Sequence, residues 1–83
     1  MDRKTLEYME ERAKKARGIV NRIEKLKKDA AKSQRADRFI FDAYQHGSYV
    51  ETKDLHLLEK MKIAFEKAVV EEIEKLEQEL AKL

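Results

Sequence analysis

Few side chains in this sequence could act as nucleophiles or bases. Besides the tyrosines, the hydroxyl residues are Thr5, Ser33, Ser48 and Thr52, and the histidines are His46 and His56. Nucleophilic catalysis needs a hydroxyl held against a base, and neither histidine has the sequence context of a catalytic pair. Ser48 lies close to His46, but it also has the capping-box spacing to Glu51 that starts a helix. We therefore expect no catalytic residues, and the sequence predicts a protein that is not an enzyme.

Two pairs of residues have a spacing that would suit a metal ion on a helix. Asp42 and His46 are four positions apart, and His56 and Glu59 are three apart, so each pair shares one helix face. Such pairs are also ordinary surface hydrogen bonds, and no repeated carboxylate–histidine motif is present. The chain has no cysteine, and its two glycines do not form a phosphate-binding loop. We expect no metal site, no cofactor and no small-molecule substrate.

Basic residues form the clearest polar pattern. Six of them fall within about 80° of one another at 100° per residue, opposite the apolar face of the same predicted helix. They are Lys14, Arg17, Lys25, Lys28, Lys32 and Arg35. A row of cations could track the phosphates of a nucleic acid or face an acidic protein surface, and it is also what a solvated helix face looks like. Its function stays open at this point.

Apolar residues at spacings of three and four predict two long helices that carry these side chains. In the first they are Leu6, Met9, Ala13, Ala16, Ile19, Ile23, Leu26 and Ala30; in the second they are Leu55, Leu58, Phe65, Val69, Ile73, Leu76, Leu80 and Leu83. We expect one helical domain over residues 1–83. Its first helix covers about 3–34, or continues to 46, a turn covers about 46–52, and a second helix covers about 53–82.

Residues 38–58 are the most unusual stretch, because they hold four of the six aromatic residues and both histidines. Helical spacing at 36–44 also allows a short middle helix. Gly47 is suited to the left-handed conformation that ends a helix. Apolar side chains near the turn are more numerous than two antiparallel helices can bury, which predicts dimerisation into a helical bundle. The expected dimer or partner interface consists of Phe39, Ile40, Phe41, Tyr44, Tyr49, Leu57, Leu58 and Met61.

Composition supports this fold class and limits the location. Charged residues make up 43% of the chain and proline is absent, which is typical of long helices or a coiled coil. No apolar run exceeds three residues, so we expect no membrane segment and no secretory signal, and a cytoplasmic protein. The fold class is therefore all-α, a long antiparallel, coiled-coil-like helical hairpin.

The expected function follows from what is present and what is missing. The chain has more apolar residues near the turn than the hairpin can bury, and it has no set of catalytic residues. This combination predicts a non-enzymatic protein of the adaptor, regulator or inhibitor type. Its expected partners are a second copy of itself, as a homodimer, and another protein. The alternative is a nucleic-acid-binding protein that uses the basic face of its first helix.

Overall fold

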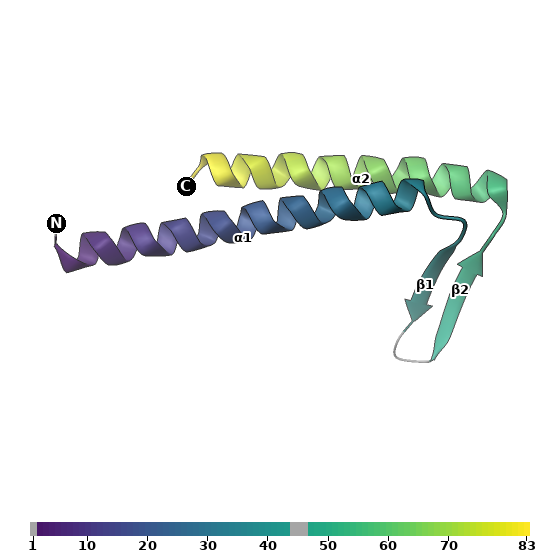
Figure 1. The fold of residues 1–83 in the computed structure, drawn as a ribbon, viewed down its shortest axis with the longest axis horizontal. Helices are drawn as coiled ribbons and strands as arrows, with labels where there is room; N and C mark the ends of the chain where they lie inside the picture. Colours follow the sequence, from purple (N-terminus) through teal and green to yellow (C-terminus); the bar gives the residue numbers. More distant parts are fainter. Residues whose placement is uncertain (1, 44–46) are drawn as a thin grey trace.

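The computed structural model describes residues 2–43 and 47–83. Its elements are helix α1 (Arg3–Gln34), strand β1 (Phe39–Ala43), strand β2 (Ser48–Thr52) and helix α2 (Leu55–Ala81). The two helices run antiparallel and pack side by side, and the two strands form a hairpin that projects away from them (Figure 1). The helical hairpin agrees with the fold expected from the sequence, and the β-hairpin is an addition to it.

Helix α1 begins at a side-chain cap. The Asp2 carboxylate accepts a hydrogen bond of 2.8 Å from the Thr5 backbone N–H, which pairs one of the free amides in the first turn. This bond holds the pKa of Asp2 below its ordinary value. At the other end, the backbone N–H of Arg35 donates to the Lys32 carbonyl and that of Ala36 donates to the Ser33 carbonyl, and the helix stops there.

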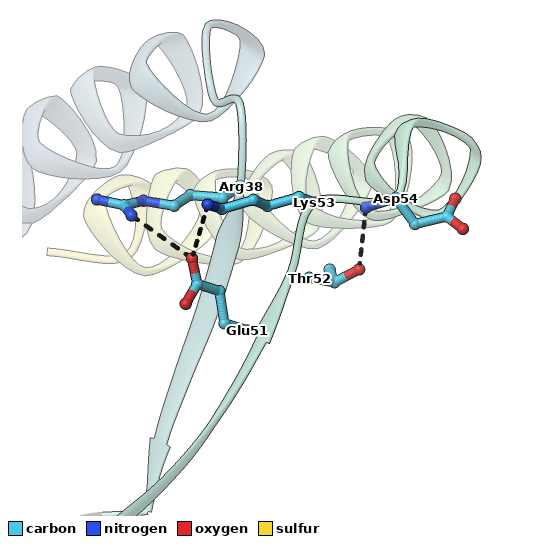
Figure 2. Close-up of polar contacts among 5 residues, drawn as sticks. All are labelled: Arg38, Glu51, Thr52, Lys53 and Asp54. Atoms are coloured by element: carbon cyan, nitrogen blue, oxygen red, sulfur yellow. Dashed lines mark hydrogen bonds and ion pairs between the residues drawn. The ribbon is translucent and has the colours of Figure 1, made fainter.

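Helix α2 begins one turn after the hairpin. The Asp54 carboxylate accepts a 3.0 Å hydrogen bond from the Leu57 N–H, and the Thr52 hydroxyl accepts a 3.3 Å bond from the Asp54 N–H (Figure 2). Asp54 is therefore the N-cap. The expectation that Ser48 starts this helix is wrong, because Ser48 belongs to β2.

The core between the helices is small. Its buried apolar side chains are Ile23 from α1 and Leu58, Val69 and Leu76 from α2. Arg22 and Glu72 form a 3.0 Å ion pair that joins the two helices beside this core. The buried hydroxyl of Ser33 is satisfied by donating to the Ala30 carbonyl at 2.7 Å.

Residues 39–43 and 48–52 differ from the expected helix, middle helix or turn. They form an antiparallel hairpin whose register pairs Phe39 with Thr52, Phe41 with Val50 and Ala43 with Ser48. Phenylalanine, isoleucine, tyrosine, valine and threonine all favour strands, and they make up most of FIFDA and SYVET. Helical spacing at 36–44 suggested a helix, because a short apolar run fits the period of a helix as well as that of a strand. Gly47 does adopt a positive φ of 60°, but between strands rather than at a helix end.

The overall shape is an elongated rod with a side arm (Figure 1). Its extents are 60 × 28 × 16 Å and its radius of gyration is 18.4 Å. A compact domain of this length would have a radius of gyration of about 12 Å. This shape leaves most of each helix surface, and most of the hairpin, outside the core.

Candidate interaction surfaces

The β-hairpin arm, residues 39–43 and 48–52, has one apolar face. Paired residues of an antiparallel ladder point to the same side, so Phe39, Phe41, Val50 and Thr52 share a face. Phe39 and Thr52 are half-buried at the base of the arm. Farther out, Phe41 is 64% exposed and Val50 is 67% exposed. The apolar face is therefore covered at its base and open toward its tip.

The other face of the arm mixes apolar and acidic side chains. Ile40 pairs with Glu51 and Asp42 pairs with Tyr49. Glu51 lies between two cations at the base of the arm, 3.5 Å from Arg38 and 4.0 Å from Lys53 (Figure 2). Exposed ion pairs of this kind contribute little to stability. These two pairs link residues on both sides of the hairpin.

Both edges of the arm are open. The sheet consists of β1 and β2, so each strand has an outer side whose backbone N–H and C=O groups receive no partner from the sheet. Proteins commonly protect such edges with charges, proline or bulges. Here β1 has the sequence FIFDA, with one charge and no proline. The outer edge of β1 is therefore suited to accept another extended strand.

The residues predicted for the interface divide into three groups. Ile40, Phe41, Tyr49 and Leu57 are exposed, and Phe39 and Met61 are half-buried. Leu58 is only 2% exposed and belongs to the core between the helices, so its assignment to an outer interface is corrected. Tyr44 lies outside the described residues. Val50 is as exposed as Phe41 but was missed, although the alternation in SYVET could have indicated it.

The basic row is a continuous solvent-facing surface. All six of its residues, Lys14, Arg17, Lys25, Lys28, Lys32 and Arg35, are exposed. Lys25 also contacts Asp29 at 2.8 Å, and this hydrogen bond lowers the pKa of the aspartate. The described part of α1 therefore presents these cations on the side away from the helix–helix core, as their spacing predicts.

The residues considered for metal binding do not converge. His56 is exposed, and Glu59 lies 3.7 Å from Lys62 rather than beside a second ligand. His46, the expected neighbour of Asp42, lies outside the described residues. Among the residues that are described, no group of three or more potential metal ligands is found. Within the same residues, no helix has the length and apolar character needed to cross a membrane.

The surface area quantifies how open the chain is. The accessible surface is 7345 Å², whereas a compact monomer of 9.8 kDa would expose about 5,200 Å². The excess is about 2,100 Å², which exceeds the roughly 800 Å² that each partner buries in an ordinary stable complex. Exposed apolar residues lie on both helices and on the arm.

Comparison with models of protein families, with curated proteins and with solved structures found no match for this chain.

Proposed function

We propose that this protein is a small, non-enzymatic interaction protein that self-associates and binds another protein through its β-hairpin arm. The excess surface of about 2,100 Å² supports self-association most strongly, since it exceeds the roughly 800 Å² that each partner of a stable interface removes from water. A chain of 83 residues gains much of its stability from such burial, because its own core is small.

The arm is the surface proposed to bind another protein. An extended segment can add to an open sheet edge through main-chain hydrogen bonds, while its alternate side chains contact apolar neighbours. The edge of β1 and the exposed face of Phe41 and Val50 offer both features. The occupant is therefore expected to be an extended peptide segment with alternating apolar residues.

Self-association is tested by size-exclusion chromatography with light scattering at micromolar concentrations. We expect a mass of at least twice 9.8 kDa. A strict monomer across the concentration range would contradict the proposal. Dilution adds a useful check, since the mass of a reversible dimer falls toward that of the single chain.

Binding through the arm is tested with variants of its apolar face. Phe41→Asp and Val50→Asp should each lower the recovery of proteins captured from the native host by tagged protein, while the circular dichroism of the helices stays unchanged. Asp42→Asn is a matched control, because it changes the opposite face of the same strand. Equal recovery of the same proteins by all variants would reject the arm as the contact.

A second candidate function is nucleic-acid binding by the basic row. The observation that favours it is the exposure of all six cations on a helix with eleven Lys or Arg residues against five Asp or Glu, a net charge of +6. Binding should weaken steeply with salt and disappear when Lys25, Lys28 and Lys32 become glutamate. No change in the anisotropy of labelled single- or double-stranded oligonucleotides at low salt would exclude it.

A further inference from the structure

One face of the helical hairpin contains a shallow groove between α1 and α2. Ala30 of α1 and Val69, Val70 and Ile73 of α2 form its apolar lining. Val69 is buried and Ile73 half-buried, whereas Val70 is 48% exposed. About two turns before Val70 on α2, Ile63 is 68% exposed and extends the apolar strip. These side chains widen the apolar surface beyond what α1 covers.

Charged residues of opposite sign border the two sides of the groove. Lys27 lies on the α1 side, and Glu66, Glu74 and Glu77 lie on the α2 side. The Arg22–Glu72 ion pair lies, by helical spacing, on the opposite face of the hairpin. The groove therefore has a basic border and an acidic border along an apolar floor.

Both helices have a second row of residues that faces this groove. On α1, the spacings of three and four continue through Leu6, Met9, Ala13, Ala16, Val20, Ile23 and Lys27. On α2, they run through Ile63, Glu66, Val70, Ile73 and Glu77. A helix that contacts two neighbours needs an apolar face wider than a single seam. On α1 this row overlaps the row that faces α2 and adds Val20 and Lys27 at its edge, whereas on α2 it adds Ile63, Glu66, Val70 and Glu77 beside the core row. The surface left for a further helix therefore lies mainly on α2.

We propose that this groove face packs against the same face of a second copy, forming a four-helix bundle in which each α1 lies beside α2 of the other copy. The inference rests on the self-association proposed above and specifies its surface. Exposed Val20, Ile63 and Val70 become buried in this bundle. The cationic row on the outer side of α1 remains accessible.

The net charges of the two helices favour this arrangement over the one in which α1 packs on α1 of the other copy. Helix α1 has a net charge of +6, and α2, with four Lys against seven Glu, has −3. A two-fold axis across the helices would place α1 on α1 and repeat like charges, which costs energy at an interface. An axis parallel to the helices places α1 on α2 of the other copy, with Lys27 near Glu66 of the second copy. It also brings both β-hairpin arms to the same end of the bundle.

The area available is sufficient for this association. An ordinary stable complex buries roughly 800 Å² on each partner. The excess surface of the whole chain, arm included, is about 2,100 Å², so less than half of it is needed. The same face on both copies satisfies the self-complementarity that a two-fold interface requires. A partner other than a second copy would need its own basic and acidic borders in positions that match those of the groove.

Light scattering on groove variants tests the interface. Val70→Asp and, separately, Ile63→Asp should shift the mass from the dimer to 9.8 kDa, with at least a tenfold rise in the dissociation constant. Both residues lie outside the buried core, so circular dichroism should still report helices. Ala64→Asp is the matched control, since it adds the same charge at an exposed position on another side of α2.

The outcomes separate the two proposals. A monomeric wild-type protein would overturn self-association and the groove interface together. A wild-type dimer that Val70→Asp and Ile63→Asp leave intact would overturn the groove interface alone. A dimer weakened equally by Ala64→Asp would also overturn it, because the effect would then come from added charge rather than from the groove.

The orientation of the copies is tested with labels on the arms. The chain has no cysteine, so Ser48→Cys introduces a single attachment site on β2. Spin labels at this position should be separated by clearly less than the 60 Å length of the molecule, because both arms lie at one end of the bundle and project to opposite sides of it. Label separations approaching the 60 Å length of the molecule would show arms at opposite ends and overturn the arrangement.

Discussion

The helical body, α1 with α2, and the β-hairpin arm hold their shapes by different means. In the body, Ile23, Leu58, Val69 and Leu76 are removed from water, and each helix starts at an aspartate cap. In the arm, the outer apolar residues Phe41 and Val50 stay exposed, and the strands pair only with each other. A two-stranded hairpin is marginal in water by itself. The body therefore has a buried core of its own, and the outer part of the arm has none.

The largest expected effect on the free energy of unfolding comes from the core of the body and not from the exposed face of the arm. Leu58→Ala removes a fully buried side chain and should lower the free energy of unfolding by about 2–5 kcal/mol. Phe41→Ala removes a larger but exposed one and should change it by less than about 0.5 kcal/mol. Urea unfolding of both variants at one chain concentration checks this. Comparable losses would mean that the arm is part of the cooperative core.

The junction between arm and body gives the next effect. Asp54 caps α2 directly after β2, and Asp54→Ala leaves the Leu57 N–H without its partner. The loss should be about 1 kcal/mol, in the range found for N-cap residues. Thermal unfolding followed by circular dichroism measures it, and Asp54→Ser should restore most of the stability. An alanine variant as stable as the wild type would show that the cap is not needed.

The two glycines should respond to alanine with opposite signs. A Cβ at Gly18 in α1 meets no atom within 4 Å, so Gly18→Ala should stabilise the body by up to about 1 kcal/mol. Gly47 has the same free space but a φ of 60°, so Gly47→Ala should destabilise the arm by about 1 kcal/mol. Chemical denaturation reports the first effect and hydrogen exchange of the β1 and β2 amides the second. A change in stability of the same sign in both variants would contradict this prediction.

The smallest expected effect concerns pH. Because Lys25 lowers the pKa of Asp29, the pair stabilises the folded chain above the ordinary carboxyl pKa. That contribution is lost as the pH falls through the lowered folded-state pKa. Both side chains face solvent, so the change in stability should be slight. An NMR titration of the Asp29 carboxyl carbon should give a midpoint below the ordinary value in the wild type, and closer to it in Lys25→Ala.

The sequence alone determined the two helices, because apolar residues at spacings of three and four are a local property of each segment. It also placed the basic row opposite the core. It did not determine the strands. Residues 39–44 satisfy a helical period and an alternating one equally well, and the choice depends on pairing with residues 48–52, which only the folded chain displays.

The tertiary structure also decided which apolar residues are free to make contacts. Leu57 and Leu58 are adjacent and chemically identical, but α2 packs Leu58 into the core and leaves Leu57 exposed. The groove with Val70 exists only because α1 covers one side of α2 and not the next. Periodicity indicates which residues share an apolar face, whereas the packing of α1 on α2 decides which of these residues remain exposed.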